Sequence, residues 1–279
     1  MKEFFETLMA MDGKKIRVAR FEPTNKAKGV IQMIHGFGES IEHYVSIAEF
    51  FVEEGYICVI HDQRGFGKEI AKKQRGVHGE YVYFLMDIDS IRRQIKEWYP
   101  TMPVYLFGHS MGGNIALNYL LRVSQKSYKK AVVESPWLGL YKPMPSVATK
   151  VATFLGKRNE NWAIPSNIDT TAIAHDEDAV GKLVNDGIYH VRISFKLYAQ
   201  VTRAGEFALK NAEKIKLPTL IFCAGKDMIV SPSAIRAFTE KADSNVELLE
   251  YPNGYHALHM DIGKEFLKQV VEFIEKDES

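Results

Sequence analysis

A serine framed by glycines carries the clearest chemical signal in this sequence of 279 residues. Ser110 lies in the run GHSMGG (108–113), after an apolar segment (104–107) and before a segment with a helical pattern. A Gly-x-Ser-x-Gly pattern between a strand and a helix holds the serine in a tight turn, with its hydroxyl projecting from the sheet. Glycine lets the two backbones approach closely, and the N–H groups that begin the helix favour negative charge there. We therefore predict that Ser110 is a nucleophile.

A serine nucleophile needs a base and a group that orients the base, and two later segments supply candidates. Asp227 follows the apolar run TLIFCAG, and His256 follows the run VELLEYP. The carboxyl ends of parallel strands meet at one edge of a sheet, where such side chains gather. We expect Ser110, Asp227 and His256 to form a catalytic triad, in the chain order serine, acid, histidine.

Two alternatives to these assignments stay open. Glu134 also ends a predicted strand and is a second candidate for the acid. His259 is a second candidate for the base, but it begins to enter the last predicted helix, so we favour His256. No third ligand is evident beside these two histidines, and two cysteines without clustered histidines cannot form a structural zinc site. We expect neither a metal nor an organic cofactor.

A glycine-rich turn, HGFG (35–38), follows the strand-like segment 30–35. An N–H group from such a turn, together with the N–H group of the residue after the nucleophile, can hold the negative oxygen that forms when an ester is attacked. We expect the N–H groups of Phe37 and Met111 to form this oxyanion hole. The alternative is a simple turn between a strand and a helix.

Short apolar strands alternate with amphipathic helices along most of the chain. Strands are expected at 30–35, 56–61, 104–107, 131–134, 219–224 and 246–251, and helices at 43–54, 81–99, 111–123, 232–242 and 262–274. Near-continuous apolar strands separated by helices predict an α/β fold whose mostly parallel central sheet is flanked by helices. An edge hairpin is expected within the first 25 residues or so.

Residues 136–211 interrupt this alternation with prolines and helical stretches near 146–155, 176–186 and 194–211, and no clear strand falls between them. We expect a core of residues 1–135 and 212–279, with residues 136–211 forming a helical cap, or lid, over the site. A purely structural excursion is the alternative. Val147, Val151, Phe154 and Leu155 form an apolar stripe. This stripe could line an acyl tunnel, contact a membrane surface or pack on the core.

Composition excludes several other classes of protein. The formal net charge of +1 lacks the basic excess that is typical of nucleic-acid binding. No apolar run approaches the roughly 18 residues of a membrane helix, and the acidic N-terminal segment does not fit a signal peptide. Cys58 and Cys223 lie within predicted strands, as reduced thiols of a cytosolic protein would. We predict a cytoplasmic protein without a nucleic-acid partner, and the oligomeric state stays open.

Together, HGFGES, GHSMGG, DQRGFG (62–67), GKDMIVSP and YHALHMD resemble the monoacylglycerol lipase/lysophospholipase family of α/β-hydrolases. Residues 136–211 are also similar to that family's cap, and the resemblance covers essentially the whole chain. It implies the α/β-hydrolase fold, the triad and the oxyanion hole expected above. It also implies a polar pocket for the alcohol of the substrate, with Glu39 and His259 at positions that line it. His43 stands where the family commonly has arginine, which puts the specificity for the alcohol in doubt.

These features predict a serine carboxylic-ester hydrolase that cleaves monoacylglycerol- or lysophospholipid-type esters through an acyl-enzyme. The substrate would be a small-molecule ester, and any transient contact with a membrane surface would be made by the cap. One alternative is a carboxylesterase of broad specificity for short-chain or aromatic esters. An alternative from another class is a non-hydrolytic ligand-binding protein on the same fold.

Overall fold

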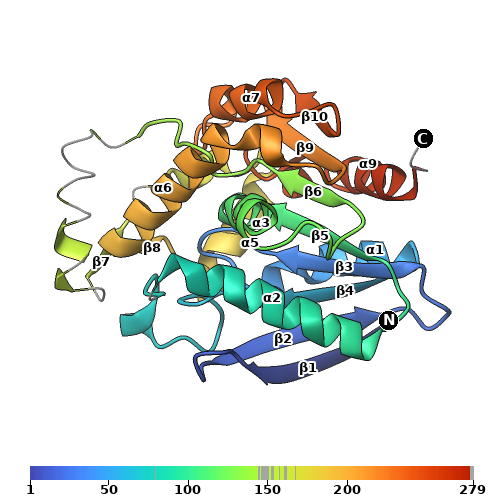
Figure 1. The fold of residues 1–279 in the computed structure, drawn as a ribbon. Helices are drawn as coiled ribbons and strands as arrows, with labels where there is room; N and C mark the ends of the chain where they lie inside the picture. The colour runs from blue at the N-terminus through green and yellow to red at the C-terminus, as the bar shows by residue number, and fades with distance from the viewer. Residues whose placement is uncertain are drawn as a thin grey trace.

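An eight-stranded sheet in the order β1-β2-β4-β3-β5-β6-β9-β10 forms the centre of the molecule (Figure 1). The computed structural model describes residues 1–78, 80–143, 145, 151, 154–156, 158–159, 162–166 and 168–276. The strands are β1 (Lys2–Met9), β2 (Lys15–Glu22), β3 (Gly29–Ile34), β4 (Tyr56–His61), β5 (Val104–His109), β6 (Ala131–Glu134), β9 (Thr219–Ala224) and β10 (Val246–Tyr251). From β4 to β10 all neighbours are parallel, whereas β1 and β2 form an antiparallel edge hairpin. The predicted α/β class and the hairpin are confirmed.

Helices cover both faces of this sheet, whose central strands are mostly apolar and are buried along their whole length. Every residue of β3, β4 and β9 is buried. The core helices are α1 (Val45–Glu53), α2 (Tyr81–Trp98), α3 (Met111–Arg122), α7 (Pro232–Lys241), α8 (Leu258–Asp261) and α9 (Lys264–Glu275). Short 3₁₀ turns span Ile41–Tyr44, Lys72–Gln74, Thr170–Ala172 and Ala212–Lys214. Figure 1 shows α2 and α3 on one face and α1 and α9 on the other, and each face has its own apolar cluster.

The chain between β6 and β9, here called the inserted segment (residues 135–218), contains α5 (Glu177–Asn185) and α6 (Phe195–Lys210). Both helices agree with the predicted stretches, whereas most of the stretch 146–155 lies outside the described residues. The expectation that no strand occurs here was wrong. β7 (Ala163–Pro165) and β8 (Arg192–Ser194) form a small antiparallel pair, and three residues are too few to show a strand pattern.

Buried asparagines fix the inserted segment to the core. The Asn114 side-chain amide donates to the carbonyl oxygens of Trp137 (2.7 Å) and Val201 (3.3 Å), and the Asn118 amide donates to Ala204 (3.1 Å). Since α3 carries both asparagines, α6 packs directly on the helix that begins after Ser110. Within the described residues, no helix is long and apolar enough to cross a membrane.

A close approach between β3 and α3 gives a test of the packing. A Cβ atom at Gly112 would clash with the carbonyl oxygens of Ile34 and His35, whereas a Cβ atom at Gly181 in α5 would meet no atom within 4 Å. We expect Gly112→Ala to lower the free energy of unfolding by about 1–3 kcal/mol, because backbone must move. Gly181→Ala should raise it by about 0.5–1 kcal/mol, because alanine favours the helix. Urea unfolding measures both, and equal effects would contradict this account.

Candidate active site

Ser110 occupies a strained turn between β5 and α3. Its backbone has φ 55° and ψ −116°, and only it and Ser135 combine a side chain with positive φ among the described residues. The surroundings hold this conformation on both sides, because Ser110 N–H donates to Glu134 O (2.9 Å) and Trp137 N–H donates to Ser110 O (3.0 Å). Strain of this kind persists only where many contacts impose it, and it occurs frequently at functional sites.

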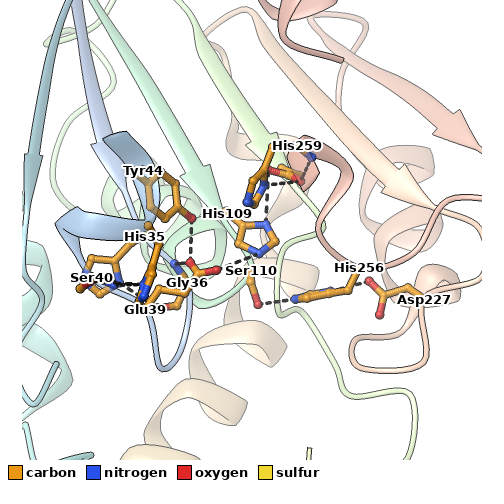
Figure 2. Close-up of polar contacts among 12 residues, drawn as sticks. His35, Gly36, Glu39, Ser40, Tyr44, His109, Ser110, Asp227, His256 and His259 are labelled. Carbon is orange, nitrogen blue, oxygen red and sulfur yellow. Dashed lines mark hydrogen bonds and ion pairs between the residues drawn. The ribbon is translucent and has the colours of Figure 1, made fainter. Parts of the chain in front are cut away.

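The three residues of the predicted triad lie in one hydrogen-bonded chain (Figure 2). Ser110 Oγ lies 2.8 Å from His256 Nε2, and His256 Nδ1 lies 2.6 Å from Asp227 Oδ2. The other oxygen of Asp227 accepts from the N–H groups of Ile229 (2.8 Å) and Val230 (2.9 Å), which fixes the carboxylate. Because Nδ1 donates its proton to the carboxylate, Nε2 is left to accept the proton of the serine.

The charge of Asp227 sets the basicity of His256. Burial disfavours the charged imidazole, but the charge and hydrogen bond of Asp227 outweigh it and raise the pKa of His256 above its ordinary value. Glu134, the other candidate acid, contacts His259 instead of His256. The contacts therefore join Asp227 to His256 and Glu134 to His259.

Two backbone N–H groups next to Ser110 have no hydrogen-bond partner within the described part of the chain. They belong to Phe37, in the turn after β3, and to Met111, the first residue of α3. The N–H group of Gly36, in contrast, donates to Glu39 Oε2 (2.6 Å). An N–H pair of this kind can stabilise an oxyanion, as the sequence predicted for these two positions.

A second polar cluster lies behind Ser110, and the sequence did not predict it. His109, next to the serine, stands between two buried carboxylates, with Nδ1 3.4 Å from Glu134 Oε2 and Nε2 4.0 Å from Glu39 Oε1. Glu134 also contacts His259 Nδ1 (2.9 Å), and the Tyr44 hydroxyl donates to Glu39 Oε2 (2.8 Å) (Figure 2). The family resemblance implied pocket positions for Glu39 and His259, and Glu134 ended a predicted strand, but no sequence signal indicated that they meet at His109.

The carboxylates of this cluster stay charged although they are buried. Burial opposes their ionisation, yet the imidazoles of His109 and His259 hold the pKa of Glu39 and of Glu134 below the usual range. Conversely, burial opposes charge on His259, but Glu134 raises the pKa of His259. His109, Glu134 and His259 bring ligand atoms within 4.8 Å of one another, a spacing that would suit a cation. Their mutual contacts already neutralise these charges without one.

Two spaces meet at Glu39. A cavity of about 30 Å³ lies over Ser110, lined among others by Phe37, Trp137, Ile173, Leu183, Tyr189 and His256. A larger pocket of about 390 Å³ is lined among others by His43, Lys182, Asp186, His259 and Met260. Glu39 and Leu183 line both spaces and separate them. Side chains from the inserted segment thus cover the serine.

The remaining predicted substrate residues are divided between these spaces and the surface. His43 lies at the larger pocket, where its Nε2 contacts Asp186 Oδ2 (2.6 Å) and its Nδ1 accepts from Ser40 N–H (3.0 Å). Val151 is 51% exposed, and Leu155 is half-buried. Neither is among the described residues that line the cavity over Ser110. The structure therefore does not bring Val151 or Leu155 to this cavity, and Val147 of the same stripe lies outside the described residues.

The fold and the Ser–His–Asp chain at the carboxyl ends of the strands define an α/β-hydrolase. The serine aminopeptidase S33 family matches residues 25–263. Because this match covers most of the chain, the protein belongs to that family. Among the proteins to which it is similar are monoacylglycerol and monoglyceride lipases. The resemblance indicated by the sequence motifs is confirmed.

Individual relatives agree with this placement. An uncharacterized abhydrolase domain-containing protein of Dictyostelium discoideum is 28% identical over 99% of this chain, which spans 29% of that protein. A putative monoglyceride lipase of Schizosaccharomyces pombe is 27% identical over 88% of this chain, which spans 65% of that protein. The solved monoacylglycerol lipase of Paleococcus ferrophilus superposes with a TM-score of 0.84 at 28% identity, covering 94% of this chain and 98% of that one. The chain thus spans less than two thirds of the first two relatives.

The contact between Glu134 and His259 predicts a stability that depends on pH. Since folding raises the pKa of His259, the stabilisation from its charged form is present at low pH and is lost as pH rises through the folded value. Glu134→Gln removes the charge that holds this proton and should lower the free energy of unfolding by about 3 kcal/mol near pH 6. The difference from wild type should shrink toward about pH 9, where the imidazole is neutral.

Urea unfolding at both pH values measures this difference, with Glu97→Gln as the control. Glu97 is an exposed residue of α2, so its replacement should change stability little at either pH. A Glu134→Gln effect that is the same at both pH values would show that His259 gains no proton from this contact.

Proposed function

We propose that this protein hydrolyses carboxylic esters of the monoacylglycerol or lysophospholipid type, with Ser110, His256 and Asp227 as its catalytic triad. One observation carries the proposal: the hydrogen-bonded chain from Asp227 through His256 to Ser110 ends beside two unpartnered N–H groups. The relatives that are named as monoacylglycerol or monoglyceride lipases support the same substrate class.

In the first half-reaction, His256 Nε2 accepts the proton of Ser110 as Oγ attacks the ester carbonyl carbon. The carbonyl oxygen becomes negative and is held by the N–H groups of Phe37 and Met111. Asp227 stabilises the imidazolium that forms and keeps the ring oriented. His256 then donates the proton to the alcohol oxygen, the ester bond breaks, and the acyl group stays on Ser110.

In the second half-reaction, a water molecule replaces the alcohol. His256 accepts a proton from this water, the resulting hydroxide attacks the acyl carbonyl, and the same two N–H groups hold the oxyanion. The proton returns to Ser110 as the acid leaves. Because the pKa of His256 is raised, its imidazole becomes neutral, and able to act as the base, only at a higher pH than an ordinary histidine needs.

The two spaces at Glu39 suggest where the two parts of the ester bind. The cavity over Ser110 is mostly apolar and suits the acyl chain, whereas the pocket with His43, Lys182, Asp186 and His259 suits a polar alcohol. We assign residues 136–211 as a cap over this site. A volume of about 30 Å³ has room for only about two or three water molecules, so a long acyl chain requires this cap to move.

That small volume also favours the second candidate function, a carboxylesterase for short-chain esters. Burying each methylene is worth about 0.8 kcal/mol, so an enzyme for long chains should gain kcat/KM with every added carbon. An enzyme whose cavity stays closed should instead lose activity beyond acetate or butyrate. The dependence of activity on chain length therefore separates the two candidates.

Covalent labelling tests the catalytic assignment. We expect a fluorophosphonate to label wild type once per chain, at Ser110, and Ser110→Ala to lose turnover by a factor on the order of 10⁶. Ser233→Ala, which replaces an exposed serine of α7, should retain full activity. Mass spectrometry locates the label. Hydrolysis by purified Ser110→Ala at the wild-type rate would refute the assignment, whereas a wild type that is neither labelled nor active would leave a ligand-binding protein as the alternative.

Cavity enlargement tests the acyl assignment. Leu183 is buried over Ser110, so Leu183→Ala should raise kcat/KM for p-nitrophenyl octanoate severalfold relative to acetate. Val151→Ala is the control, because Val151 is on the surface and should leave this ratio unchanged. The ratio is measured with both esters on each variant. A Leu183→Ala ratio equal to that of wild type would place the acyl chain elsewhere.

A further inference from the structure

The loop that carries His256 is closed by one buried carboxylate. Asp261, the last residue of α8, has a side chain that is 1% exposed. Its Oδ2 accepts from the N–H group of Tyr255 (2.8 Å), the residue directly before His256. The carboxylate therefore fixes the start of the loop from inside the protein.

The other oxygen of this carboxylate reaches across to the inserted segment. Asp261 Oδ1 accepts from the backbone N–H group of His175 (2.7 Å) and from its Nδ1 (2.7 Å). The His175 ring also stacks on the Tyr255 ring, with centroids 3.7 Å apart. His175 is thus joined to the loop by three contacts, although its side chain is 53% exposed.

The same part of the inserted segment also binds the residue directly after His256. The N–H group of Ala257 donates to the carbonyl oxygen of Ile173 (2.8 Å). Both backbone neighbours of His256 are therefore tied down, Tyr255 by Asp261 itself and Ala257 by the segment that Asp261 holds. None of these contacts touches the imidazole, so they can affect it only through the position of the loop.

We propose that Asp261 is a positioning residue, which together with residues 173–175 holds His256 in line with Ser110 and Asp227. The segment 173–175 leads directly into α5, and α5 carries Leu183 over Ser110. The position of the base therefore depends on whether residues 173–175 of the cap stay in contact with the loop of His256. If these residues move away, the loop is no longer held. This inference rests on the proposed function, since it assigns His256 as the base.

The contacts of Asp261 with Tyr255 and His175, here called the clamp, should have a measurable effect on the kinetics. Asp261 lies outside both spaces at Glu39, so its loss should leave KM nearly unchanged. A displaced base slows the chemical step, and a misplacement of about 1 Å can cost on the order of a hundredfold in rate. The titratable groups that face His256 are Asp227, Glu134, Glu39 and His109, and Asp227 acts most strongly in raising the pKa of His256. Moving the ring away from Asp227 should therefore shift the acid limb of the pH–rate profile to lower pH.

Asp261→Asn in the full chain tests the proposal, assayed with p-nitrophenyl acetate. Asparagine keeps the shape but offers one acceptor oxygen, so either Tyr255 or His175 loses its partner. We expect kcat to fall about tenfold to a hundredfold, KM to change less than about twofold, and the acid limb to move to lower pH. Asp178→Asn, at an exposed acid in the first turn of α5, is the matched control and should leave all three unchanged.

Substitutions at the exposed His175 test the clamp without touching the buried carboxylate. His175→Ala removes the Nδ1 contact and the ring stack, and should lower kcat about threefold at unchanged KM. His175→Asn places an amide donor near the position of Nδ1 and should restore most of this loss. If Asp261→Asn fails to fold, as judged by circular dichroism, the two His175 variants test the clamp on their own.

The outcomes separate this inference from the proposed function. Absence of fluorophosphonate labelling at Ser110 in wild type refutes the proposed function before any clamp variant is made. If the wild-type protein is labelled, a kcat of Asp261→Asn or His175→Ala equal to that of wild type contradicts the role proposed for Asp261. The proposed function would then be unaffected. The clamp is also overturned if the activity of Asp261→Asn falls only in proportion to the folded fraction, with an unchanged pH profile.

Discussion

The close approach of α3 to the ends of β3 and β5 is the constraint on which the rest of this site depends. Gly112 packs against the backbone carbonyls of Ile34 and His35, where any side chain would clash. This contact holds α3 against the strand ends, while the backbone hydrogen bonds of Ser110 with Glu134 and Trp137 hold its positive φ. Backbone contacts therefore bring Ser110 close to the N–H groups of Phe37 and Met111.

Around this backbone frame, the electrostatics of the site rest on paired charges. Asp227 balances His256, while Glu39 and Glu134 share the neighbouring His109 and His259. Burying a carboxylate without such partners would lower the stability of the folded protein, so each acid is paired with hydrogen-bond donors. The two groups lie in different places. The first lies at Ser110, where we propose that it supplies the base, and the second reaches both spaces through Glu39, His109 and His259.

The inserted segment supplies the side chains that cover the site. It supplies Leu183 and Tyr189 over the serine, and Asp186 pairs with His43 at the larger pocket. Through His175 it is also connected to the loop of His256. If the proposed function holds, covering of the serine and alignment of the base thus depend on the same segment.

The sequence alone determined the central fold and the strained turn at Ser110, because both depend on local patterns. Continuous apolar runs predict buried parallel strands such as β3 and β4, and glycines at fixed spacing predict the turn at Ser110. The positions of Asp227 and His256 followed from strand ends, since the edge of a parallel sheet is a geometric consequence of its topology. Tertiary structure alone decided which of several acids and histidines meet, which side chains cover the serine, and that Asp261 holds the loop of His256. These contacts join segments far apart in the chain, and no local periodicity encodes which faces of such segments pack together.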